Sequence, residues 1–313
     1  MTRKILVAVE NTVYCRKIPQ YLRGVFSGDI DVIFYFHTVV PHYGSQASGE
    51  LLEQQDILAT LGNTERKKFA GCKTHLLELK EEFLKNGFAE NQIEIEVSIS
   101  SGGVAHKIIH TAIQGKFDAI VIGKKNLGLL EKIVSGSISA TILAQNDRIP
   151  VWVVNGDIHS NKVLVPVDCS PHTLDAIDHL AFILKNNPLV DITLFHSCSM
   201  LAQEKVYPTD LFYEKWGKEW VDQHLQGDAD GHFHFHGPEQ ILRENGFPME
   251  RVHRLQTDTG IEPGQQIVRL VKHDGYGTVV MGRRHKDISK GIFQGVSDRV
   301  LANVSDVALW VVG

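Results

Sequence analysis

Two segments of the chain share one spacing: a glycine, two residues, a variable position, nine residues and a second glycine. In the first segment these positions are Gly123, Asn126 and Gly136, and Ser137 follows. In the second they are Gly282, His285 and Gly295, and Val296 follows. Glycine lets backbone N–H groups approach an anion without a Cβ in the way, and the first turn of a following helix favours negative charge. The first segment therefore predicts a phosphate-binding loop, to which Ser137 and Ser139 would add hydroxyl groups.

A carboxylate follows the first apolar run of each half. Glu10 comes after KILVAV and Asp168 after KVLVPV. Carboxylate oxygens only accept hydrogen bonds, and ribose hydroxyls can donate to them. A phosphate loop together with such a carboxylate suits an adenine nucleotide.

These elements occur twice because the chain is an internal duplication. KILVAVE (4–10) matches KVLVPVD (162–168), AIVIG (119–123) matches TVVMG (278–282), and PVWVV (150–154) matches ALWVV (308–312). Two domains are also what 313 residues predict. We expect domains over 1–156 and 160–313, joined by the short linker Asn155–Asn161.

The apolar runs must form strands buried on both faces, which is typical of parallel sheets covered by helices. The expected strands are 4–9, 31–37, 93–100, 119–122 and 151–154 in the first half, and 162–167, 190–196, 251–256, 278–281 and 308–312 in the second. The expected helices are 14–26, 48–86 (interrupted at Gly62 and Gly71), 104–114, 136–145, 171–185, 211–224, 239–244, 264–273 and 296–302. Alternating strands and helices predict an α/β fold: two tandem, doubly wound parallel-sheet domains of five strands each. Ligands of such sheets bind beyond the carboxyl ends of the strands.

The loop spacing, present in both halves, resembles the G-x2-G-x9-G-[ST] motif of the universal stress protein family, tandem type. His37 and His196, each near the end of a second strand, strengthen the resemblance. It implies the adenine nucleotide alpha hydrolase-like fold, and we expect the two halves to be related by a pseudo-twofold axis with their last strands paired. It also implies a stress-response or regulatory protein that binds ATP or AMP.

Carried onto this sequence, the resemblance predicts a nucleotide site in the first half. The residues expected there are Ala8, Val9, Glu10, Thr38, Ile122, Gly123, Asn126, Gly136, Ser137 and Ser139. Asn126 stands where the family has its middle glycine, and Glu10 stands where the family has aspartate. Lys124 and Lys125 would offset phosphate charge.

The second half departs further from the motif. Its corresponding positions are Asp168, Gly282, His285 and Gly295. Val296 replaces the hydroxyl residue, and Asp298 would repel a polyphosphate at a cost of about 1–4 kcal/mol. We expect this second site to be degenerate.

A separate candidate is the segment GHFHFHG. On an extended strand His232, His234 and His236 would share one face and could bind zinc. Alternate residues of a strand lie about 6.5–7 Å apart, which is too far for all three to bind one ion without a bend. A solvated loop is the alternative interpretation.

Composition excludes several classes of partner. The net charge of −5 gives no reason to expect nucleic acid or a membrane surface, and no run of ~20 apolar residues is present. The four cysteines lack CxxC spacing, which favours reduced thiols and the cytoplasm.

No residue is a credible general base, so we expect no catalytic residues and at most slow ATP hydrolysis. Three functions stay open: nucleotide-dependent regulation of an unknown protein partner or a homodimer, a nucleotide-free interaction scaffold that binds metal through the histidines, and an ATPase.

Overall fold

The computed structural model describes residues 2–10, 17–26, 28–42, 61–123, 138–168, 170–197, 209–225, 233–257, 261–283 and 296–313. The chain forms two compact units, one of Met1–Arg23 and Gly28–Gly156, the other of Gly24–Ser27 and Asp157–Gly313. Each unit contains a five-stranded parallel α/β sheet, as the sequence predicts.

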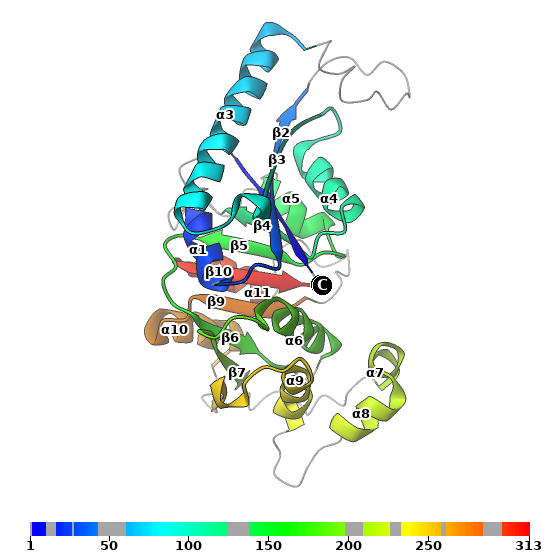
Figure 1. Ribbon diagram of the computed structural model, residues 1–313. Coiled ribbons are helices and arrows are strands. Elements are labelled where there is room, and N and C mark those ends of the chain that lie inside the picture. Colours follow the sequence, from blue (N-terminus) through cyan, green and yellow to red (C-terminus); the bar gives the residue numbers. More distant parts are fainter. Residues whose placement is uncertain are drawn as a thin grey trace. The chain divides into compact units, whose positions relative to one another are not determined.

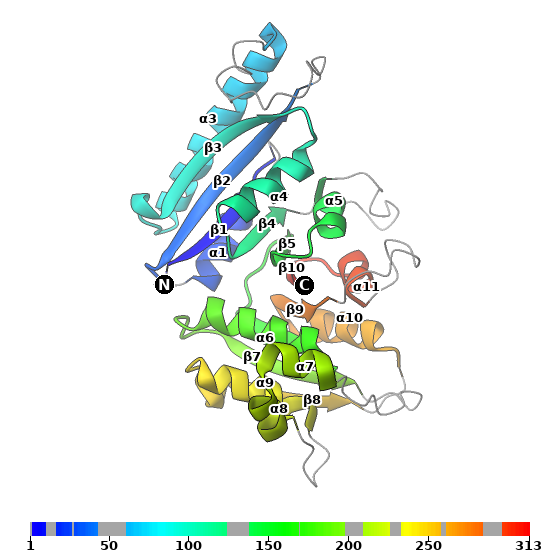
Figure 2. The same cartoon turned by 90° about the vertical axis from the view of Figure 1, so that its right-hand side faces the viewer.

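In the first unit the strands are ordered β3-β2-β1-β4-β5. The elements in chain order are β1 (Arg3–Ala8), α1 (Ile18–Val25), β2 (Val32–Pro41), α3 (Asn63–Lys85), η2 (Glu90–Gln92), β3 (Ile93–Ser100), α4 (Val104–Gln114), β4 (Ala119–Gly123), α5 (Ile138–Gln145) and β5 (Val151–Asn155). In Figure 1, α3 (cyan) runs along β2 and β3, and Figure 2 shows α4 and α5 on the other side of this sheet.

The side chains of β2 alternate between these two layers. Phe34 and Phe36 pack against Phe83 of α3, with ring centroids 5.6 and 4.5 Å apart. Tyr35 and His37 face the opposite way, where Tyr35 lies 5.2 Å from the ring of Phe117. The period of two places Thr38, the next residue of the strand, on the α3 side of the sheet.

The second unit repeats the order as β8-β7-β6-β9-β10. Its elements are β6 (Lys162–Pro166), α6 (Pro171–Leu184), β7 (Asp191–Ser197), α7 (Thr209–Trp216), α8 (Lys218–His224), α9 (Phe233–Glu244), η3 (Met249–Arg251), β8 (Val252–Thr257), α10 (Pro263–Asp274), β9 (Thr278–Gly282), α11 (Val296–Asn303) and β10 (Val307–Val312). Helices α6 and α9 pack together, as do α10 and α11 (Figure 2).

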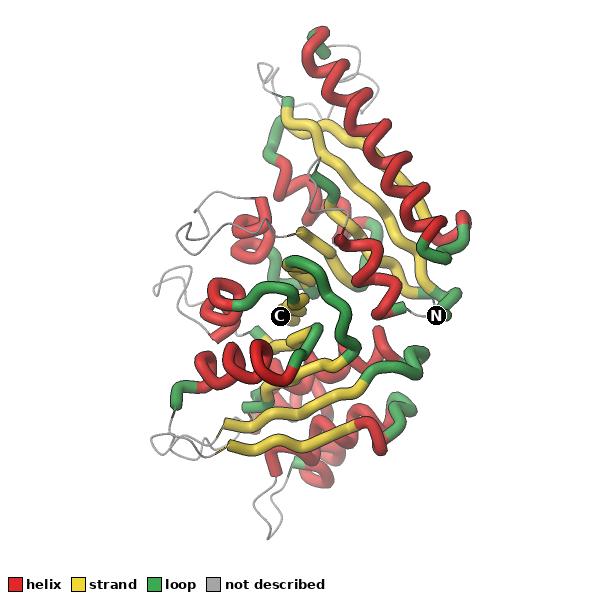
Figure 3. The backbone as a smooth tube through the Cα atoms, turned by 90° about the vertical axis from the view of Figure 1, so that its left-hand side faces the viewer, coloured by secondary structure: helices red, strands yellow, loops and turns green. Residues whose placement is uncertain are grey.

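The structure corrects two predicted helices and the interpretation of the histidine-rich segment. Helix α3 continues through Gly71 without the expected interruption, and Figure 3 shows it as one long red helix. The expected helix 211–224 is two helices, because Gly217 adopts φ 77° between α7 and α8. The segment expected to be extended around His234 is the first part of α9.

The amino end of the first sheet contains a buried ion pair. Arg3, the first residue of β1, contacts the carboxylate of Asp29 at 2.5 Å, and both side chains are at most 4% exposed. The Arg3 N–H also donates to the carbonyl of Asp31, 2.9 Å away. The pair therefore joins β1 to the segment that precedes β2.

Candidate nucleotide-binding site

In the first unit the strand order reverses between β1 and β4, where doubly wound sheets bind their ligands. Ala8 pairs with Ile122, so the carboxyl ends of β1 and β4 are adjacent. Val9 and Ile122 are buried, while Glu10 and Gly123 are partly exposed at this edge. The structure thus brings together the strand-end residues that the sequence predicts.

The structure describes only some of the remaining predicted residues. Ser139 is the second residue of α5 and is partly exposed. Asn126, Gly136 and Ser137 lie outside the described residues, as do Lys124 and Lys125. In the second unit His285 and Gly295 also lie outside them.

Thr38 is almost buried, with 7% of its surface exposed. Its hydroxyl donates to the carbonyl of Val9 at 2.9 Å. The Val9 N–H in turn donates to the carbonyl of His37, also at 2.9 Å. The end of β1 is therefore held to β2 by backbone and side chain together.

The glycines that end β4 and β9 each face the first helix of their own domain. A Cβ added to Gly123 would have, as its nearest neighbour among the described atoms, Cδ1 of Ile18 at 3.8 Å, which is an ordinary contact. A Cβ on Gly282 would lie 2.1 Å from the carbonyl oxygen of His172 and 2.3 Å from its carbon. The first turn of α6 therefore lies directly on Gly282.

Asp168, the second-unit counterpart of Glu10, accepts hydrogen bonds from the start of the same helix. Its Oδ1 accepts from the hydroxyl of Ser170 at 2.5 Å and from that of Thr173 at 2.7 Å. Ser170 also caps α6 by accepting from the Thr173 N–H, and Pro171 is the first residue of the helix. Sequence reasoning missed these partners, although the string Ser-Pro-His-Thr after Asp168 is a helix-start signal that could have revealed them.

The two histidines near the ends of the second strands are not equivalent. Ala8 pairs with His37 in the first sheet, but Pro166 pairs with Phe195 in the second, so His196 stands at the register position of Thr38. A shift of one residue turns a side chain to the other face of its sheet. The apparent match of His37 with His196 is thus a coincidence of residue type.

His37 is fully buried on the α4 side of its sheet, with Nε2 2.7 Å from the hydroxyl of Ser98. Burial, reinforced by the positive charge of Lys107, lowers the pKa of His37 from 6.5 to about 4. The imidazole is therefore neutral at physiological pH.

The low pKa makes stability depend on pH. In the unfolded chain His37 becomes protonated below about pH 6.5, whereas in the folded chain it becomes protonated only below about pH 4. Between these values the free energy of unfolding should fall with decreasing pH, by up to about 1.4 kcal/mol per unit. His37→Gln keeps a donor for Ser98 and should show a shallower slope in urea unfolding measured from pH 7 to 4. Equal slopes for the two proteins would contradict this assignment.

The histidine-rich segment, for which an extended strand and a solvated loop were the alternatives, is helical from Phe233 onward. His234 and His236 lie on α9, where residues two apart point in nearly opposite directions. The ring of His234 stacks on that of His196 at 3.7 Å. His232 lies outside the described residues, and those that are described contain no group of three or more side chains able to hold a metal ion.

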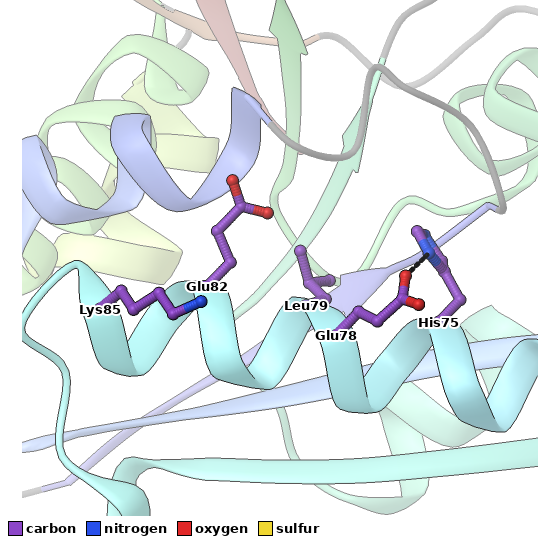
Figure 4. A pocket seen from close by; sticks show the side chains of 5 residues that line it. All are labelled: His75, Glu78, Leu79, Glu82 and Lys85. Carbon is purple, nitrogen blue, oxygen red and sulfur yellow. Dashed lines mark ion pairs between the residues drawn. The ribbon is translucent and has the colours of Figure 1, made fainter.

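One pocket of about 410 Å³ lies along α3 (Figure 4). The described residues lining it are His75, Glu78, Leu79, Glu82 and Lys85. His75 Nδ1 is 3.8 Å from a carboxylate oxygen of Glu78. None of these residues belongs to the predicted nucleotide site.

None of the helices within the described ranges is both long enough and apolar enough to span a bilayer.

No curated protein matches the chain. Solved structures do resemble it in fold. A universal stress protein from Archaeoglobus fulgidus DSM 4304 has a TM-score of 0.64 and 17% identity, over 99% of this chain and 95% of that one. A protein described as a putative universal stress protein from Pseudomonas aeruginosa UCBPP-PA14 has a TM-score of 0.54 and 12% identity, over 99% and 93%.

A third structure is that of the universal stress protein from Archaeoglobus fulgidus in complex with dAMP. It has a TM-score of 0.30 and 18% identity, and covers 48% of this chain and 96% of that one. The family model for the universal stress proteins matches this chain twice, over residues 1–155 and 159–312. The duplicated loop spacing, the two five-stranded sheets and this double match lead to one conclusion: the chain belongs to the universal stress protein family and contains two copies of its domain.

Proposed function

We propose that this chain is a cytoplasmic stress-response or regulatory protein that binds an adenine nucleotide, AMP or ATP, in its first domain (1–156). The second domain (160–313) binds none. Nucleotide binding would change the shape or the partner-binding surface of the protein. We assign no catalytic residue, and any hydrolysis of ATP would be slow and incidental.

The close contact at Gly282 carries the division between the two domains in this proposal. A phosphate group that approaches the backbone of this glycine needs the space that a side chain would otherwise occupy. At Gly282 the carbonyl oxygen of His172 would lie only 2.1 Å from an added Cβ. In our proposal this carbonyl occupies the space that a phosphate group would need in the second domain.

The carboxylates at the ends of the first strands occupy corresponding positions in the two domains. Asp168 Oδ1 already accepts two hydroxyl groups from the start of α6, so that oxygen is engaged within the second domain. In the first domain Glu10 stands at the adjacent carboxyl ends of β1 and β4, where it could accept hydrogen bonds from a ribose. Ser139, in the first turn of α5, is on the element that would receive the phosphates.

Acid extraction of the gently purified protein, followed by chromatography, should release AMP or ATP. In our proposal Gly136→Val places a side chain in the phosphate loop and should weaken AMP binding by more than about tenfold, or about 1.4 kcal/mol. Isothermal titration calorimetry would measure this.

Gly295→Val, the same change in the second domain, is the matched control and should leave AMP affinity unchanged. A blank extract, with no heat on titration of AMP or ATP, would favour the nucleotide-free scaffold. Equal losses in the two variants would show that the second domain binds as well.

A further inference from the structure

A single backbone carbonyl is held by a side chain at the same place in both domains. In the first domain the Thr38 hydroxyl donates to the carbonyl of Val9 at 2.9 Å. In the second, Nδ1 of His196 lies 2.9 Å from the carbonyl of Val167, and since a carbonyl only accepts, that nitrogen carries the proton. Two unrelated residue types thus make one bond at equivalent register positions.

The bond fixes the direction of the next peptide group. Both the N–H of Val9 and its carbonyl face β2, since their partners are the His37 carbonyl and the Thr38 hydroxyl. In a trans peptide the carbonyl and the following N–H point in opposite directions. The N–H of Glu10 is therefore directed away from β2, toward the β4 side of β1.

We propose that Thr38 is a positioning residue for the nucleotide, an inference that rests on the function proposed above. By holding the Val9 carbonyl, Thr38 sets the backbone of Glu10 and hence the point from which its carboxylate reaches the ribose. The hydroxyl proton of Thr38 is committed to Val9, so the side chain acts through the peptide and not as a donor to the ligand. Thr38 is nearly buried, which shields this bond from competing water.

Thr38→Val tests the proposal, because valine matches the shape of threonine but cannot donate a hydrogen bond. The full-length protein should be titrated with AMP and with 2′-deoxy-AMP. The second ligand lacks one hydroxyl group from which the carboxylate could accept a hydrogen bond. We expect the unchanged protein to prefer AMP about tenfold, as for loss of one hydrogen bond to a charged group. In Thr38→Val the affinity for AMP should fall about tenfold with little change for 2′-deoxy-AMP, and Thr38→Ser should restore the preference.

His196→Val removes the corresponding bond from the second domain and should leave both affinities as they were. If Thr38→Val weakens both ligands equally, Thr38 has only a general structural role and this inference is overturned while the proposed function stands. The same holds if the unchanged protein binds both ligands equally well, since no ribose contact then exists to be positioned. Failure of the unchanged protein to bind AMP or ATP would overturn the proposed function and this inference together.

Discussion

Gly282→Ala should destabilise the second domain by about 3 kcal/mol, near the upper end of what overpacking usually costs. The added methyl group would lie 2.1 Å from the carbonyl oxygen of His172 and 2.8 Å from its Cβ. Backbone atoms cannot rotate out of the way as the end of a flexible side chain can, so β9 or the start of α6 must move. Urea unfolding followed by circular dichroism would measure the effect.

Gly123→Ala is the matched control for Gly282→Ala. Its methyl group would make an ordinary contact with Ile18 Cδ1 at 3.8 Å, and our proposal that the first domain leaves room for a ligand predicts a change of less than about 0.5 kcal/mol. Equal destabilisation by the two substitutions would show that both glycines are required only for the turn. In that case the crowding at Gly282 would not distinguish the two domains.

The second large effect is expected at the Arg3–Asp29 pair. Asp29→Ala removes the carboxylate that lies 2.5 Å from the buried guanidinium of Arg3, and should lower the free energy of unfolding of the first domain by about 3 kcal/mol. The double substitution of Arg3→Met with Asp29→Leu removes both charges and should recover much of that loss. Urea unfolding of the three proteins would measure this.

The surface pair of Lys80 and Glu90 provides the comparison for Asp29→Ala. Its atoms are 2.9 Å apart, but the Glu90 side chain is 79% exposed. Lys80→Ala should leave the unfolding midpoint almost unchanged, because water replaces the lost contact. A double variant at Arg3 and Asp29 no more stable than Asp29→Ala would contradict the explanation by loss of this buried ion pair.

The strands were predictable because most are short runs of apolar residues, or of apolar residues alternating with polar ones, between turn residues. Ile93–Ser100, for example, is observed with the bounds expected from its sequence. The helices were less predictable where tertiary packing outweighs local preference. Gly71 costs α3 some stability, yet the helix continues because Leu76, Leu79 and Phe83 of its later turns are buried against the sheet. The alternation of His234 and Phe235 fits a strand by pattern alone, but Phe235 is buried within α9.

The candidate site was predictable in part for a different reason. Residues at the ends of neighbouring parallel strands must lie together, so Ala8, Ile122 and Gly123 could be assigned from strand order. The contact of the His172 carbonyl with Gly282 could not, because a carbonyl group is the same in every residue and leaves no trace in the sequence. The inequivalence of His37 and His196 was also hidden, since it depends on a register that only the paired strands reveal.

This register has a practical consequence for hybrids made from the two halves. An exchange guided by matching letters would swap His37 with His196 and place an imidazole among the side chains of the wrong layer. An exchange guided by strand pairing would swap Thr38 with His196 and His37 with Phe195. Hybrids of the second kind keep each side chain in its own layer, and they would test whether the ligand recognition that we propose for the first domain can be moved to the second.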